Sequence, residues 1–166
     1  IKKNKKPKYK VLFVGTAHSD RYKISNYIKN WCDKNNFSTF MYYYIQSKLV
    51  YFLKSIFDKS YMGVQDFNFR NISFKSLTID EIISYYEESS IILDINLPNQ
   101  RGLTMRSLEA LGAGKKIITT NKEIIKYSFY DINNILVIDR DKIKLGKDFF
   151  ESNFNPIDKE LLFNMS

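Results

Sequence analysis

Apolar residues in this chain occur in two patterns: short continuous runs, and stretches in which they recur every three or four positions. A continuous run is typical of a strand buried on both faces, and the wider spacing is typical of a helix with one buried face. Strands are expected at residues 11–14, 37–45, 68–74, 91–97, 116–120 and 134–139. Helices are expected at residues 22–32, 47–57, 79–86, 103–111 and 122–127, with further helix in the C-terminal tail. This alternation predicts an α/β fold, with an open parallel sheet of about six strands and helices on both faces.

Polar residues mark where two of these helices begin. Thr78 precedes an expected helix and is followed three positions later by Glu81, which is the pattern of a capping box. Ser19 or Asp20 is placed to cap the first helix. Cys32, the only cysteine, falls within that helix, so we expect a buried thiol.

The length and composition suit a single domain. The chain has 166 residues, of which 44% are hydrophobic, enough to bury one core. No run approaches the roughly 18 to 20 apolar residues of a spanning helix, and no signal-peptide pattern is present, so a cytoplasmic protein is expected. Residues 1–10 are expected to be a linker from a missing N-terminal domain, and residues 11–166 to be one domain. The formal net charge of +8 suits a nucleic acid or an anionic membrane as partner, but much of it lies in this linker, and charge runs are usually solvated.

Parallel sheets bind ligands at the carboxyl ends of their strands, so the loops after residues 14, 97 and 120 are the places to search. The second loop leads through Gly102 into a helix. The amide groups of Leu103, Thr104 and Met105 at this helix start are expected to face an anion, with the helix dipole behind them. The segment therefore predicts a cradle for a diphosphate.

Two charged side chains on the same helix extend this prediction. Arg106 is expected to add a charged donor to the phosphates, and Glu109, one turn further along, to accept two vicinal ribose hydroxyls. The alternative is an ordinary exposed pair of Arg106 and Glu109 on an amphipathic helix. In either case Met105, Leu108 and Leu111 are expected to share the core face.

The first loop carries a second group of candidate residues. Gly15 permits a turn, Thr16 offers a hydroxyl, and His18 and Arg21 are placed to approach a phosphate. His18 is the only histidine, which excludes a pair of catalytic histidines and a multi-histidine metal site; its alternative role is that of a loop residue without a ligand. The glycine spacing excludes a dinucleotide-binding fingerprint, and no P-loop motif is present. Asp94 ends an apolar run, but no acidic residue follows the first strand as a receiver domain would need.

The segment at residues 100–121 resembles the donor site of GT-B glycosyltransferases, whose C-terminal half is a Rossmann-like domain. The closest likeness is to bacterial enzymes of lipopolysaccharide and capsule assembly with a Gln-x-Gly-Leu-Thr-x-Arg-x-x-Glu stretch. That stretch is matched here by Gln100, Gly102, Leu103, Thr104, Arg106 and Glu109. A Gly-Thr-x-His-x-x-Arg loop of the same enzymes is matched by Gly15, Thr16, His18 and Arg21. In the wider family the second glutamate of a Glu-x7-Glu motif holds the ribose, which maps to Glu109, whereas Arg101 stands where the first glutamate would be.

This resemblance implies a domain that binds a nucleoside-diphosphate sugar for transfer to a polysaccharide or lipopolysaccharide acceptor. It implies neither a cofactor nor a metal. The catalytic base is expected in the missing N-terminal half, so the fragment is expected to bind nucleotide without transferring sugar. A saccharide or lipid-linked acceptor would be held by that half, in the cytoplasm or at the inner face of the membrane with peripheral membrane contact.

The alternative from another class is a non-catalytic α/β module that binds nucleotide or RNA. It is based on the basic charge and on the aromatic run at residues 40–44, which suits the stacking of bases. Aromatic residues that favour strands more often form an ordinary strand. Nucleic acid is therefore not the expected partner.

Overall fold

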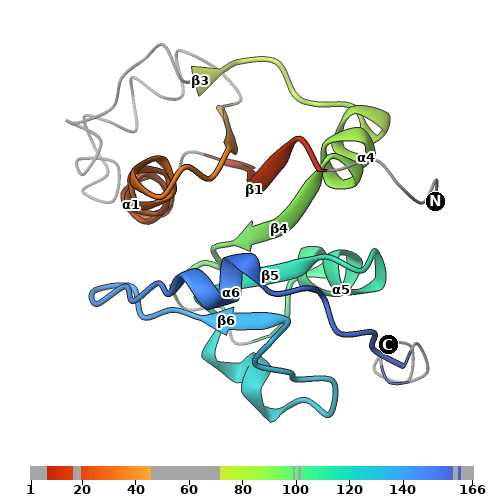
Figure 1. Ribbon diagram of the computed structural model, residues 1–166. Coiled ribbons are helices and arrows are strands. Elements are labelled where there is room, and N and C mark those ends of the chain that lie inside the picture. The colour runs from red at the N-terminus through yellow and green to blue at the C-terminus, as the bar shows by residue number, and fades with distance from the viewer. Residues whose placement is uncertain are drawn as a thin grey trace.

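A parallel sheet forms the centre of the molecule (Figure 1). The computed structural model describes residues 7–16, 20–45, 72–98, 100, 102–158 and 161. Within them the strands are β1 (Tyr9–Thr16), β2 (Thr39–Tyr44), β3 (Ile72–Ser73), β4 (Ser89–Asp94), β5 (Lys116–Thr119) and β6 (Ile135–Val137). They are all parallel and lie in the order β3-β2-β1-β4-β5-β6. The predicted α/β fold with an open parallel sheet is confirmed.

Helices cover both faces of this sheet, as predicted. They are α1 (Arg21–Lys34), α4 (Ile79–Glu87), α5 (Met105–Gly112), the 3-10 helix η2 (Lys122–Lys126) and α6 (Lys147–Glu151). α1 and α6 pack on one face, and α4, α5 and η2 on the other (Figure 1). Successive strand residues point to opposite faces, so Ile92 joins the second core while Ile91 and Leu93 join the first.

The strands and helices differ from the expected boundaries by a few residues. β1 begins at Tyr9, two residues before the expected start, because the Tyr9 amide donates to Glu88 O at 2.9 Å. Tyr9 and Lys10 therefore belong to the sheet and not to a linker. The expected strand at residues 68–74 is described only as β3, and the expected helix at residues 47–57 lies outside the described residues. The aromatic run at residues 40–44 forms the strand β2.

Both predicted cap residues stand at the start of their helices, but only one makes the expected cap hydrogen bonds. The Thr78 hydroxyl accepts from the Glu81 amide at 3.2 Å, and the Glu81 carboxylate accepts from the Thr78 amide at 2.8 Å, which completes the capping box. Asp20 is the N-cap residue of α1, yet its side chain makes no cap hydrogen bond. Its carboxylate instead accepts from the Arg140 guanidinium.

Two consecutive lysines, Lys115 and Lys116, each bind the C-terminus of a helix, one on each face of the sheet. Lys115 Nζ donates to Ser89 O at 2.8 Å and to Glu87 O at 3.2 Å, at the C-terminus of α4. Lys116 Nζ donates to Phe149 O at 2.5 Å and to Ser152 Oγ at 2.7 Å, at the C-terminus of α6. Burial lowers the pKa of Lys116 to about 8. These contacts suit helix C-termini, whose carbonyl groups attract cations.

Aromatic side chains hold α6 against α1. The Phe150 ring is fully buried and lies 4.6 Å from the Trp31 ring and 5.2 Å from the Phe37 ring, measured between centroids. Cys32 lies in the same core with none of its surface exposed, so the predicted buried thiol is confirmed. Burial, and then the nearby Asp33 carboxylate, raises the pKa of Cys32 to about 12.

Cys32 therefore reports on opening of this core. A thiol reacts as the thiolate, and here it is both covered and protonated at pH 8. We expect iodoacetamide to modify Cys32 at least about 100-fold more slowly in native buffer than in about 6 to 8 M urea, a concentration that unfolds small domains. The extent of modification would be followed by mass spectrometry. Equal rates in the two conditions would contradict the packing of α1 described above.

Candidate functional site

The connectivity of the sheet places a switch point between β1 and β4. From β1 the chain passes outward to β2 and β3, then returns to β4 and continues outward to β5 and β6. The loops after β1 and β4 therefore leave neighbouring strands in opposite directions, and such a switch point is where open α/β sheets bind ligands. β1 and β4 are paired through Leu12 and Ile92, so their carboxyl ends lie at the same edge.

A buried carboxylate at the end of β4 fixes the start of α5. Asp94 is 1% exposed, and its Oδ2 accepts from Thr104 Oγ1 at 2.5 Å and from Ser107 Oγ at 2.7 Å. Thr104 is the N-cap residue of α5, and its hydroxyl also accepts from the Ser107 amide at 3.2 Å. The helix start is thereby held against the strand end. Sequence reasoning missed this role, although Asp94 interrupts an otherwise apolar strand.

The predicted arginines that follow the two loops lie near this switch point, close enough for Arg106 to lower the pKa of Arg21. Arg21 Nε donates to Ile95 O at 2.9 Å, and its Nη1 donates to Thr16 Oγ1 at 2.8 Å. Arg106 Nη1 lies 3.9 Å from Asp94 Oδ1, which is an ion pair without a short hydrogen bond. Burial, and then repulsion from Arg106, lowers the pKa of Arg21. Thus the two cations remain close together, and no carboxylate of the described residues lies within ion-pair distance of Arg21.

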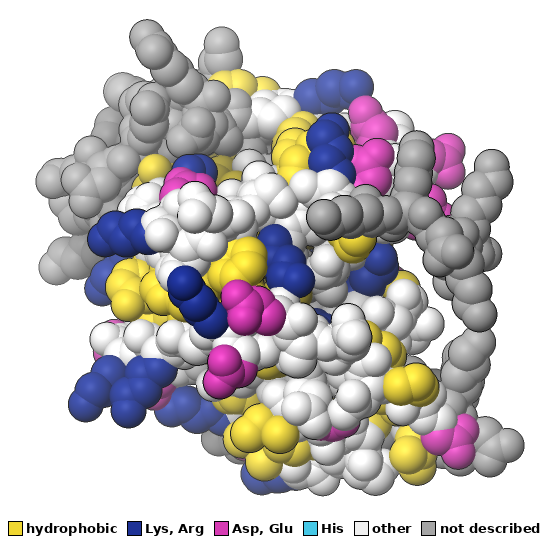
Figure 2. All heavy atoms as spheres, viewed as in Figure 1, with side chains coloured by type: hydrophobic (Ala, Val, Ile, Leu, Met, Phe, Trp, Pro, Cys, Tyr) yellow, Lys and Arg dark blue, Asp and Glu magenta, His cyan; other side chains and the backbone are white. Residues whose placement is uncertain are grey.

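A third arginine, Arg140, completes the charged cluster. It follows β6 and forms an ion pair with Asp20 at 2.7 Å. The cluster thus brings three guanidinium groups together with the carboxylates of Asp20 and Asp94. Elsewhere, on the face seen in Figure 2, Lys and Arg side chains are interspersed with acidic and apolar ones.

Buried amide and hydroxyl groups form the neighbouring edge of the sheet, after β4 and β5. Thr120 Oγ1 donates to Asn96 Oδ1 at 2.5 Å, and Asn121 Nδ2 donates to Gly102 O at 3.0 Å. Asn96 Nδ2 in turn donates to Gln100 O at 2.9 Å. These bonds hold the loop that leads into α5. They border an open cavity of about 550 Å³.

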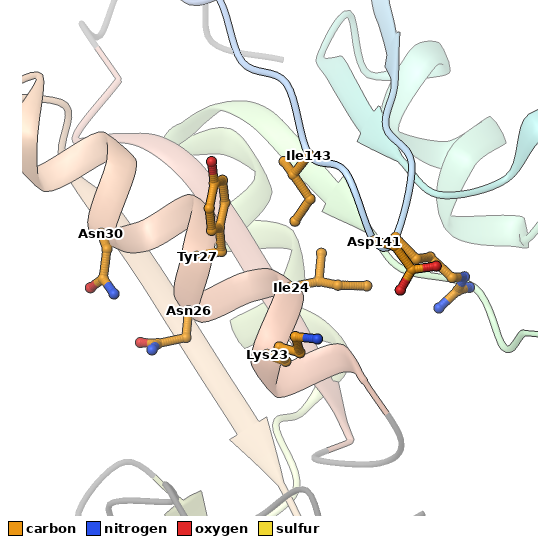
Figure 3. Close-up of a pocket in the computed structure, with 8 residues that line it drawn as sticks. Lys23, Ile24, Asn26, Tyr27, Asn30, Asp141 and Ile143 are labelled. Carbon is orange, nitrogen blue, oxygen red and sulfur yellow. The ribbon is translucent and has the colours of Figure 1, made fainter.

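A second, smaller cavity lies on the α1 side of Arg140. Its volume is about 280 Å³, and Figure 3 shows Ile24 and Tyr27 of α1 facing Ile143 across it. Arg140 and Asp141 line both cavities and thus separate them. Sequence reasoning assigned no role to Arg140, Asn96, Thr120 or Asn121. Each is a polar residue at the carboxyl end of a strand, and that is the signal that points to them.

The remaining predicted site residues are Gly15, Gly102, Leu103 and His18. Gly15 is required by packing, because a Cβ there would come within 2.8 Å of the Phe13 ring. At Gly102 a Cβ would meet nothing within 4 Å, so the space beside that loop is open. Leu103 is half-buried and packs on the second core. His18 lies outside the described residues, and its role stays a prediction.

One expectation about α5 is wrong, and the alternative given for its two charged side chains is not found. Met105 is 69% exposed and does not face the core, whereas Ser107 is fully buried because its hydroxyl bonds to Asp94. The exposed pair of Arg106 and Glu109 does not form either: Arg106 turns towards Asp94. Glu109 is exposed and makes no ion pair among the described residues.

Tyr86 of α4 lies beside the same charges. Burial raises the pKa of Tyr86 to about 12, and the nearby Arg106 guanidinium opposes this shift. The phenol is therefore neutral at physiological pH, and it adds no charge to the cluster. Its ring is half-buried against the second core and walls off one side of Arg106.

The Asp94 contacts predict a specific stability loss. In Asp94→Asn the amide oxygen can replace Oδ2, but the amide nitrogen then lies against the Arg106 guanidinium, donor against donor. We expect the free energy of unfolding to fall by about 1 to 3 kcal/mol in urea denaturation. Asp33→Asn is the matched control: it breaks an exposed ion pair with Lys29, and the expected loss is below about 0.5 kcal/mol. Equal losses in the two variants would remove Asp94 from the support of α5.

Comparison with known proteins adds no assignment to this site: no protein-family model, no curated protein and no solved structure matches the chain. Among the described residues, no helix is long and apolar enough to cross a membrane. Among the same described residues, no group of three or more His, Cys, Asp or Glu side chains could hold a metal ion.

Proposed function

We propose that this chain is the donor-binding domain of a bacterial GT-B glycosyltransferase of lipopolysaccharide or capsule assembly, and that it binds a nucleoside-diphosphate sugar. The observation that carries the proposal is the meeting of Arg21 and Arg106 at the switch point, beside the N-terminus of α5. The resemblance of residues 100–121 to the family's donor site supports the same placement.

The diphosphate is assigned to the start of α5. The first amides of a helix have no acceptor within the helix and carry the positive end of its dipole. Asp94 Oδ2 already accepts from two hydroxyls, and at 3.9 Å from Oδ1 the Arg106 guanidinium keeps donors for a phosphate. Two cations facing each other cost free energy, and an anion between them relieves that cost.

The ribose is assigned to Glu109. Arg106 and Glu109 stand three positions apart on α5, so their side chains emerge from neighbouring turns of one helix. With Arg106 turned to Asp94, the Glu109 carboxylate is exposed and remains available to accept two vicinal hydroxyls. A nucleoside diphosphate with its phosphates at Arg106 places its ribose towards this carboxylate.

The proposed role in catalysis is electrostatic. When the bond from the sugar to the diphosphate breaks, negative charge develops on the leaving phosphate, and fixed amides and guanidinium groups stabilise it without reorganisation. Arg21 and Arg106 are the side chains assigned to this role, and His18 is a further candidate. The catalytic base and the acceptor are assigned to the other half of such an enzyme.

Removal of either arginine tests the placement of the phosphates. Arg21→Ala and Arg106→Ala should each weaken a nucleoside diphosphate by roughly 10- to 100-fold and the matching nucleoside by less than about 2-fold, because charge-assisted bonds to phosphate are lost. Uridine and guanosine diphosphates would be titrated by calorimetry at fixed salt. Lys23→Ala removes an exposed cation from the same first turn of α1 and serves as the control.

Two results would count against this proposal. Equal losses for nucleoside and nucleoside diphosphate would place the phosphates elsewhere. Tight, steeply salt-dependent binding of single-stranded RNA with no effect of nucleotide would favour the alternative binding module.

Glu109 allows a test of the ribose placement by a double cycle. Glu109→Gln should cost on the order of 1.5 to 3 kcal/mol in binding of the ribonucleotide, because a charged acceptor is replaced by a neutral one. A 2′-deoxynucleotide should bind wild type more weakly but lose little further on the variant, since the partner hydroxyl is already gone. Glu151→Gln, an exposed position on α6, is the control. Strictly additive losses in calorimetry would remove Glu109 from the site.

A further inference from the structure

Arg140 reaches from the end of β6 to the start of α1. Its Nη1 donates to both carboxylate oxygens of Asp20, at 2.8 and 2.7 Å. Its Nη2 donates to Asn96 O at 2.5 Å, to Asn96 Oδ1 at 2.9 Å and to Thr120 Oγ1 at 3.1 Å. One planar side chain therefore joins the N-cap of α1 to the carboxyl ends of three strands, and a guanidinium is suited to this because its donors form a rigid fork.

Arg21 forms a second link parallel to the first. Asp20 and Arg21 are consecutive residues at the start of α1, and Ile95 and Asn96 are consecutive residues after β4. Arg21 donates to Ile95 O, and Arg140 joins Asp20 to Asn96. The start of α1 is thus tied to the end of β4 at two adjacent points, with one arginine at each.

We propose that Arg140 is a positioning residue that holds the Arg21 guanidinium in place for a phosphate. This proposal rests on the proposed function. Without the Arg140 fork, the Arg21 side chain is the remaining described hydrogen-bond link from the start of α1 to the end of β4. Arg21 would then have to anchor the helix and bind the anion at once, and its position would vary with that of the helix.

The use of Asp20 supports a role in the site over a role in capping. An aspartate at an N-cap ordinarily accepts from an amide of its own helix and stabilises that helix. Asp20 makes no such bond, and its carboxylate accepts from Arg140 instead. The ion pair also lies at the surface: the Arg140 side chain is 21% exposed and that of Asp20 is 29% exposed. Arg140 lines both cavities, so the link lies at a cavity wall and not in the core.

The test uses Arg140→Lys, which keeps the charge and loses the fork. We expect the affinity for a nucleoside diphosphate to fall about 10-fold in calorimetry, and the affinity for the matching nucleoside to change less than about 2-fold. In an Arg21→Ala background the same change should lower affinity less than about 2-fold, because Arg140 acts through Arg21. Equal losses for the two ligands, or losses that add fully to those of Arg21→Ala, would overturn the proposal.

Lys122→Met is the matched control. Lys122 forms an ion pair with Asp139 at 2.6 Å and borders the larger cavity with Arg140, and no hydrogen bond or ion pair of the described residues joins it to α1. Both ligands should bind this variant within about 2-fold of wild type. A 10-fold loss here as well would show that any cation at this strand end matters, and it would also overturn a specific role for Arg140.

A measurement without ligand separates this proposal from the proposed function. If wild type binds no nucleoside diphosphate, the proposed function fails, and the positioning role is then read from hydrogen exchange. The Ile24 amide donates to Asp20 O at 2.9 Å, so its exchange reports on the start of α1. We expect this amide to exchange at least about 5-fold faster in Arg140→Lys and at an unchanged rate in Lys122→Met. Unchanged exchange in Arg140→Lys would overturn the positioning role.

Discussion

The buried carboxylate of Asp94 is the contact on which the carboxyl edge of the sheet depends. A carboxylate that is 1% exposed needs strong donors around it, and here two hydroxyl donors come from the first turn of α5. Satisfying Asp94 therefore fixes the N-terminus of α5 against the end of β4. The orientation of the whole helix follows from this, because Ser107 must face inward to reach Asp94 and Met105 is then turned to solvent.

The same contact explains why Asp94 holds Arg106 only loosely. Asp94 uses one oxygen for Thr104 and Ser107, so its attraction to Arg106 acts at 3.9 Å through the other. Asp20 is bound in the same way to Arg140. Both carboxylates of the cluster thus have structural partners, and Arg21 faces Arg106 without a described counter-charge at ion-pair distance.

The sequence was sufficient to predict the strands and most helices, because burial on one or two faces leaves a periodic pattern. β4 and β5 were recognisable as apolar runs, and the capping box of Thr78 and Glu81 predicted the start of α4. The orientation of α5 was not predictable in this way: the apolar pattern favours Met105 in the core, and the structure buries a serine through a polar contact ten or more residues away in sequence. The link from Arg140 to Asp20 spans 120 residues, and no local pattern marks it. What a sequence does show is a polar residue after an apolar strand, and such residues hold the starts of α1 and α5 in place.

Cations at the two edges of the sheet have different partners, and this difference favours an anion at the carboxyl edge alone. At the amino edge the helices α4 and α6 end, and their carbonyl groups at Glu87 and Phe149 accept hydrogen bonds from Lys115 and Lys116. Cations and helix termini therefore neutralise each other there. At the carboxyl edge helices begin, and their free groups are amides, which donate hydrogen bonds and cannot accept them from an arginine. Arg21, Arg106 and the start of α5 are all donors, and an anion bound beside them would accept from all three together. A diphosphate has the charge and the number of oxygens to do so.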